Sequence, residues 1–290
     1  VVLLDDDTAR AGNTDGAVAA TPLPEGTFHW FFPNGTTAAV NGRSDGQLRL
    51  KLSDGVTAWV NIASVAAPLP AGTPPPRTTQ RLVRLYASGP SVAARFALSQ
   101  RVPFRVDEDG NRLTVRLYGT RMDLDWVQYG STDAFVDRVT WDQASNDEGV
   151  VTLELAKPVF GYRPRWQGSA LILEIRRPPV IDARRPLRGR TIAVDPGHPP
   201  TGATGPTGFE EKDANLGVAR ALRRLLEAAG AHVIMTRDAD TAVGLYERTN
   251  LAERKEAEVL VSIHNNAFPD GVNPWVNNGT SAYYYQPRSA

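Results

Sequence analysis

The chain has 290 residues, which favours two or more domains because domains average about 150 residues. Its 32 basic and 32 acidic residues give a formal net charge of zero, which argues against nucleic-acid binding and against a polybasic membrane anchor. The sequence contains no cysteine, so disulfides, thiolate metal sites and cysteine nucleophiles are excluded, and no apolar stretch is long enough to cross a bilayer.

The first segment, residues 1–23, shows little hydrophobic pattern and is predicted to be a tail. Because the chain begins with Val1 instead of Met, we expect a processed or truncated product from which an export signal would already be gone.

Residues 24–65 are predicted to form a small all-β module. Asn-Gly or Asp-Gly turn signals stand at 34–35, 45–46 and 54–55, and residues 47–52 alternate strictly between polar and apolar. The strand that ends in Ala58-Trp59-Val60 resembles those of bacterial Src-homology-three-like barrels. A proline-rich segment, residues 66–79, is predicted to be an extended linker.

Residues 80–178 are predicted to form a β-sandwich. Apolar residues alternate along several segments, and a hydrophobic pattern recurs after 57 or 58 residues, so that Leu113 corresponds to Leu171 and Leu117 to Ile175. Two similar sheets packed face to face would produce such a repeat. The arrangement resembles the AMIN domain, a β-sandwich that precedes exported cell-wall amidases.

After a short arginine-rich linker, residues 179–190, the periodicity changes to that of an α/β domain over 191–290. Strands are expected at 191–195, 231–236, 259–263 and 281–285, and helices at 213–230 and 245–258. The strand at 259–263 is almost continuously apolar, which is typical of a mostly parallel sheet covered on both faces.

Two of the four histidines follow strands of this predicted sheet. His198 comes three residues after one strand, and His264 directly follows another. Both would lie at the carboxyl edge of a parallel sheet, where such folds place their ligand sites. A carboxylate from Glu210 or Glu211, at the entry to the next helix, would complete a three-ligand zinc site; the alternative is that both histidines are ordinary loop residues. His29 and His232 have no such setting.

Four motifs in order then carry a family resemblance: residues 192–198, 211–216, 236–248 and 262–267. Together they are similar to zinc-dependent N-acetylmuramoyl-L-alanine amidases. The resemblance implies that His198, Glu211 and His264 hold zinc, since the family's acidic ligand directly precedes a lysine, which excludes Glu210. It also implies hydrolysis of the amide between N-acetylmuramic acid and the L-alanine of the peptidoglycan stem peptide.

Other residues of these motifs receive weaker assignments. Asp195 either orients the His198 ring or caps the following loop, and Asn266 corresponds to a residue that lines the family's site. Arg237 and Arg248 are expected to be structural ion-pair partners. The Pro199-Pro200 pair stands where the family usually has Gly-Gly, which predicts a stiffer loop.

The catalytic base has no assigned residue. In the family it is a glutamate of a late strand, and this chain stops at Ala290 where the preceding helix should begin, so we expect an incomplete and inactive amidase domain. The alternative function is a peptidoglycan-binding protein with an amidase-like domain that performs no chemistry. A phosphate-binding loop at 202–208 is a third reading, but it lacks the P-loop pattern. We expect a periplasmic or extracellular location in the cell envelope, with peptidoglycan as the partner; a protein activator is left open.

Overall fold

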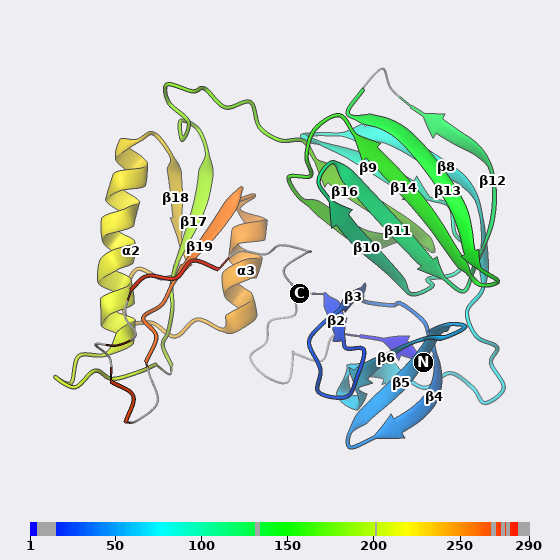
Figure 1. Cartoon of the computed structure of the whole chain (residues 1–290), viewed down its shortest axis with the longest axis horizontal. Coiled ribbons are helices and arrows are strands. Elements are labelled where there is room, and N and C mark those ends of the chain that lie inside the picture. Colours follow the sequence, from blue (N-terminus) through cyan, green and yellow to red (C-terminus); the bar gives the residue numbers. More distant parts are fainter. Residues whose placement is uncertain are drawn as a thin grey trace. The chain divides into compact units, whose positions relative to one another are not determined.

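The computed structural model describes residues 1–4, 16–130, 134–200, 202–267, 271–273, 276 and 279–283. The chain divides into two compact units, and the described residues up to 179 form the first while those from 180 form the second. The first unit is entirely β apart from one short 3-10 turn, and the second is α/β (Figure 1). The expectation of a mostly β chain with a C-terminal α/β domain is therefore confirmed.

The N-terminal part of the first unit is a small module of short strands. Val18, Phe32, Leu50 and Val60 lie in its core. Its strands are β1 (Val2–Leu3), β2 (Ala17–Ala20), β3 (Trp30–Pro33), β4 (Ala39–Ser44), β5 (Gln47–Ser53), β6 (Val56–Asn61) and β7 (Val65–Ala67), with the 3-10 turn η1 (Ile62–Ser64) between the last two.

The prediction of a tail over residues 1–23 was wrong for the described part of that segment. Strand β1 pairs with β7 and β2 pairs with β3, and Leu3 and Val18 are buried in the module core. Strands of two and four residues, the second made of alanine and valine, are too short to produce a recognisable alternation. The segment between strands is also shorter than the predicted linker of residues 66–79, because β7 ends at Ala67 and the next strand begins at Thr78.

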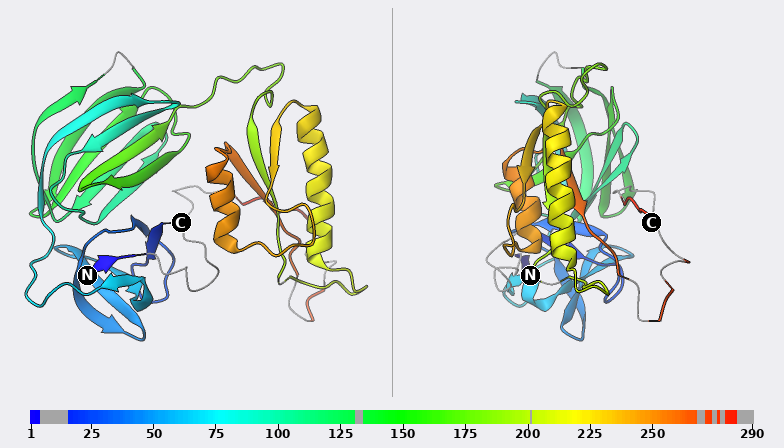
Figure 2. Two further views of the ribbon diagram at one scale, coloured as in Figure 1. Left: turned by 180° about the vertical axis from the view of Figure 1, so that it is seen from behind. Right: turned by 90° about the vertical axis from the view of Figure 1, so that its left-hand side faces the viewer.

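The second part of the first unit consists of two packed sheets (Figure 2). One has the order β10-β11-β14-β13 and the other β12-β8-β9-β16-β15. The strands are β8 (Thr78–Ser88), β9 (Ser91–Phe96), β10 (Phe104–Asp109), β11 (Arg112–Tyr118), β12 (Thr120–Tyr129), β13 (Val136–Ser145), β14 (Glu148–Leu155), β15 (Tyr162–Gln167) and β16 (Ala170–Arg176). Leu113 and Leu171, which correspond in the internal repeat, lie in different sheets and share one buried core.

The small module and the sandwich share a buried contact. Tyr118, at the end of β11, is 2% exposed and belongs to the core of the small module. Its hydroxyl accepts a hydrogen bond from the Trp30 indole Nε1 at 3.2 Å. Burial is the main reason that the pKa of the Tyr118 phenol is raised. One aromatic residue of the sandwich thus completes the core of the neighbouring module.

Replacement of Tyr118 with Phe should destabilise the first unit by about 1–3 kcal/mol, because it leaves the buried Trp30 N–H without an acceptor. The measurement is urea denaturation followed by tryptophan fluorescence. Tyr129→Phe is the control, since Tyr129 is 48% exposed and its change should stay within about 0.5 kcal/mol. Equal stability of both variants would show that the Trp30 contact contributes nothing.

The second unit has a three-stranded parallel sheet of order β18-β17-β19, against which two helices pack (Figure 1). Its elements are β17 (Thr191–Pro196), α2 (Glu211–Ala228), β18 (His232–Met235), α3 (Leu245–Arg254) and β19 (Val259–Ile263). Ile192, Val194 and Ala219 form the centre of its core. Helix α2 buries few of its side chains, namely Asn215, Leu216 and Ala219. Gly230, with φ of 90°, follows the end of the helix, as expected for a helix stop.

A strand was predicted at 281–285, but residues 281–283 are not in a strand and the last two lie outside the described residues. Within the described part of the chain, no helix is both long enough and apolar enough to cross a bilayer.

Candidate metal centre

The two histidines predicted as ligands lie at the same edge of the sheet. Strands β17 and β19 are parallel neighbours, with Asp195 opposite Ser262 and Pro196 opposite Ile263. The Gly197 N–H donates to the Ile263 carbonyl at 2.9 Å, which extends the pairing by one residue. His198 and His264 therefore leave adjacent strands at the carboxyl end, and their ring centroids are 5.0 Å apart.

Glu211, the first residue of α2, lies between the two imidazoles. Its Oε2 is 3.2 Å from His198 Nε2, and its Oε1 is 3.2 Å from His264 Nδ1. One ligand atom from each of the three residues lies within 4.8 Å of the other two. The neighbouring Glu210 is exposed and pairs with Lys212 at 2.9 Å. The structure thus brings together the three residues predicted as ligands.

The donor set fits a zinc ion. Two imidazoles and one carboxylate are a set that zinc uses, and bonds of about 2.0–2.1 Å in a tetrahedral arrangement hold ligand atoms about 3.3–3.4 Å apart. Each imidazole lies 3.2 Å from a different oxygen of Glu211, so whichever oxygen binds the ion has one histidine nitrogen close to that distance. Hydrogen bonds from imidazole N–H groups to the carboxylate would give similar separations. Because both arrangements fit the distances, the cluster is a candidate metal centre.

The Glu211 carboxylate is held by donors from three segments. It accepts hydrogen bonds from the Ala203 N–H at 3.1 Å, the Asn265 N–H at 3.0 Å and the Asn215 side-chain amide at 3.4 Å. Burial opposes its ionisation, but these bonds and the nearby His198 outweigh burial, so the pKa of Glu211 lies below its usual range. A metal ligand must be deprotonated, and this carboxylate is prepared for that role.

Asn215 was not predicted as a site residue. It is completely buried on α2, donates to the Gly197 carbonyl at 3.1 Å and accepts from the Asn265 side chain at 2.7 Å. It thereby links Glu211 to the segments that follow both strands. Its position four residues after Glu211 puts both side chains on one helix face, and this spacing was the available signal.

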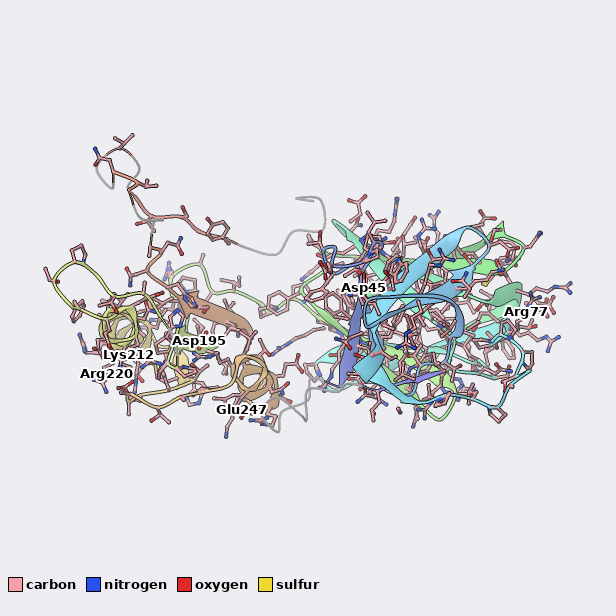
Figure 3. The ribbon with its side chains drawn as sticks, turned by 90° about the horizontal axis from the view of Figure 1, so that it is seen from below. Asp45, Arg77, Asp195, Lys212, Arg220 and Glu247 are labelled. Atoms are coloured by element: carbon pink, nitrogen blue, oxygen red, sulfur yellow. The ribbon has the colours of Figure 1, made fainter. Side chains whose placement is uncertain are left out.

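Asp195 lies deeper in the sheet, in the α/β unit that also carries Lys212 and Glu247 (Figure 3). It is 4% exposed and accepts hydrogen bonds from Thr236 Oγ1 at 2.6 Å, Ser262 Oγ at 2.7 Å and Arg248 Nη1 at 2.6 Å. Burial alone would raise its pKa, but these three donors and the charge of Arg248 lower it. Among the described residues, its carboxylate makes no hydrogen bond to the His198 ring.

Arg248 connects Asp195 to the loop that carries His198. Besides the ion pair with Asp195, its guanidinium donates to the carbonyl of Pro196 at 3.0 Å and to those of His198 and Pro199 at 3.4 Å. The expectation that Arg248 is a structural ion-pair partner is confirmed. Asn266 is exposed two residues beyond His264, and its contact with substrate stays a prediction.

The space between the two histidine-bearing segments admits no side chain at Gly197. A methyl group at this residue would overlap the imidazole ring of His264. Gly197→Ala should therefore displace His264 and raise the zinc dissociation constant. We expect the rise to be no smaller than that caused by loss of an orienting contact, which is about 10–100-fold.

The measurement is competition with a chromophoric chelator. Gly217→Ala is the matched control because Gly217 lies in α2 with nothing within 4 Å of an added methyl group, so it should bind zinc as the unchanged chain does. Unchanged zinc binding by Gly197→Ala would argue against His264 as a ligand.

The second unit is thus an α/β domain with a histidine–glutamate–histidine cluster at the carboxyl edge of its sheet. Residues 192–290 match the family model of N-acetylmuramoyl-L-alanine amidase. The chain is 40% identical over 152 residues to the germination-specific N-acetylmuramoyl-L-alanine amidase of Bacillus subtilis, covering 47% of this chain and 56% of that protein.

Two further proteins are similar to the chain. It is 40% identical over 193 residues to N-acetylmuramoyl-L-alanine amidase AmiC of Neisseria meningitidis, which covers 66% of this chain and 39% of that one. Among solved structures, AmiC2 of Nostoc punctiforme is 38% identical over 28% of this chain and 46% of its own, with a TM-score of 0.27. The sequence matches support the amidase family for the C-terminal part of the chain. The chain spans about half or less of the length of these relatives.

Proposed function

We propose that the second unit is a zinc-dependent amidase domain that cleaves the bond between N-acetylmuramic acid and L-alanine in peptidoglycan. The convergence of His198, Glu211 and His264 at one sheet edge is the observation that supports it most directly. The match of residues 192–290 to the amidase family supplies the substrate class. Zinc, when bound, would polarise the scissile carbonyl and lower the pKa of a bound water.

The protein's own residues prepare the site for this chemistry. Glu211 is kept ionised by its N–H donors, and Asn215 holds it against the loop that bears His198. The exposed Asn266 is proposed to contact the substrate next to the scissile bond.

We assign the general acid–base role to none of the described residues. Glu210 forms an ion pair with Lys212. Asp195 is buried, and its carboxylate accepts hydrogen bonds from three side-chain donors. This observation is why a peptidoglycan-binding protein that performs no chemistry stays the second candidate.

The experiment uses the purified 290-residue chain. Elemental analysis after dialysis measures retained zinc, and mass spectrometry of digested cell-wall sacculi measures the release of stem peptides with a free L-alanine amine. Zinc retention together with peptide release supports the amidase. Zinc retention without release is expected of an amidase domain that lacks its acid–base residue, binding to sacculi with neither zinc nor release supports the second candidate, and absence of both zinc and binding would contradict both functions.

For the first unit, we propose that the small Src-homology-three-like module and the AMIN-like sandwich retain the protein on the cell wall, outside the cytoplasm. The resemblances of their sequences support this, as does the relationship of the second unit to amidases of the cell wall. Co-sedimentation of the chain with purified sacculi tests retention, and a sedimented fraction no larger than that of an unrelated protein would contradict it.

A further inference from the structure

Arg237 was expected to be an ion-pair partner, but this expectation is wrong for the described residues, among which no carboxylate contacts its buried guanidinium. It is 4% exposed, lies two residues after the end of β18, and forms no ion pair among the described residues. Burial, followed by the nearby Arg248, lowers the pKa of its guanidinium. An unpaired buried charge is costly for a fold, so its hydrogen bonds must compensate for the lost water.

Within the described part of the chain, Arg237 donates only to backbone carbonyls, which belong to two segments of the metal centre and to its own turn. Nε donates to the Pro196 carbonyl at 2.9 Å, and Nη2 donates to the Gly197 carbonyl at 3.0 Å and the Lys212 carbonyl at 2.7 Å. Nη1 donates to the Ala239 carbonyl at 3.0 Å. Gly197 precedes His198, and Lys212 follows Glu211.

We propose that Arg237 is a positioning residue that sets the separation between the ligands His198 and Glu211. A single nitrogen, Nη2, bridges the backbone next to one ligand and the backbone next to the other. The planar guanidinium fixes the directions of these bonds, whereas a lysine ammonium has no such fork. The two ligands lie on different elements, the end of β17 and the start of α2, and Arg237 joins those elements.

This inference rests on the proposed zinc site, and it concerns affinity and geometry at that site. Arg237→Lys keeps a positive charge but cannot reach four carbonyls at once. We expect its zinc dissociation constant to rise by about 10–100-fold, the usual effect of losing an outer partner of a ligand. We expect Arg237→Ala to bind zinc more weakly still, with partial recovery when methylguanidine is added.

Arg190→Ala is the matched control. Arg190 is also largely buried in the second unit, where it pairs with Glu258 at 3.3 Å, but it precedes the first residue of β17 and so lies at the opposite end of that strand from His198. Arg190→Ala should lower the unfolding midpoint without changing zinc affinity, which separates loss of stability from loss of ligand positioning.

The experiment measures zinc affinity by chelator competition, folding by circular dichroism, and the visible absorption of the cobalt-loaded full chain. We expect folded Arg237→Lys to bind zinc more weakly and to show an altered cobalt spectrum, while Arg190→Ala matches the unchanged chain in both. An Arg237→Lys protein with normal affinity and spectrum would overturn the inference, as would equal weakening in Arg190→Ala. Failure of the unchanged chain to bind either metal would overturn the proposed zinc site itself, and this inference with it.

Discussion

Replacement of Glu211 with Gln is expected to abolish zinc binding and any amide hydrolysis together. The amide has nearly the shape of the carboxylate but is neutral, and zinc sites in proteins use carboxylate, imidazole and thiolate ligands. The substitution also turns one acceptor into an NH₂ group that must face the N–H donors of Ala203 or Asn265 or one of the two imidazoles. We therefore expect a loss of zinc affinity greater than the about 10–100-fold typical of an outer partner.

Glu210→Gln is the matched control for this prediction. It makes the same chemical change one residue earlier, at an exposed side chain that pairs only with Lys212 among the described residues. Zinc competition and peptide release are measured for both variants. If Glu210→Gln lost zinc and Glu211→Gln retained it, the ligand assignment would be wrong; if both retained it, the carboxylate would not be a ligand.

The two adjacent glutamates also show which part of the candidate site could be predicted from the sequence. The positions of His198 and His264 follow from strand ends in a parallel sheet, which periodicity alone predicts. Periodicity could not choose between Glu210 and Glu211, because adjacent residues at a helix entry differ in direction by about 100° and helix starts are uncertain by one or two residues. The family resemblance favoured Glu211, and the structure places that residue between the imidazoles.

For the arginines behind the site, the sequence predicted ion pairs, which Arg248 forms with Asp195, but it did not predict their contacts with the backbone. Arg237 and Arg248 act on backbone carbonyls, and which carbonyls point inward depends on the path of the loop after β17. No side-chain pattern encodes that path. Similarly, Tyr118 is the last residue of a sandwich strand, and nothing in the sequence of that strand indicates that its side chain completes the core of another module. Contacts that cross between elements were therefore missed where the elements themselves were predicted.

Replacement of Asp195 with Asn should cause a large loss of stability in the second unit. Asp195 and Arg248 form an ion pair at 2.6 Å with side chains only 6% and 9% exposed. Removing the negative charge leaves the Arg248 guanidinium buried without a counter-ion, and breaking such a pair costs about 3–5 kcal/mol. The free energy of unfolding, measured by urea denaturation with circular dichroism, should fall accordingly at pH 7.

Asp238→Asn is the control for this prediction. Asp238 also pairs with arginines, Arg220 at 3.0 Å and Arg223 at 3.2 Å, but its side chain is 53% exposed. Solvent screens such pairs, so its replacement should cost no more than about 1 kcal/mol. Equal losses for the two variants would show that burial does not strengthen the Asp195 pair.

The pH dependence of the Asp195 contribution has a defined sign. Hydrogen bonds and Arg248 hold its folded pKa below its ordinary value, although burial acts in the opposite direction. The unfolded chain therefore takes up a proton at Asp195 before the folded chain does as the pH falls. The stabilisation is complete above the unfolded pKa of about 3.9 and is lost as the pH falls through the lower folded value. The stability difference between the unchanged chain and Asp195→Asn should thus be constant from neutral pH down to about pH 5 and shrink below it. A difference that stays constant into strong acid would mean that the ion pair with Arg248 does not stabilise this unit.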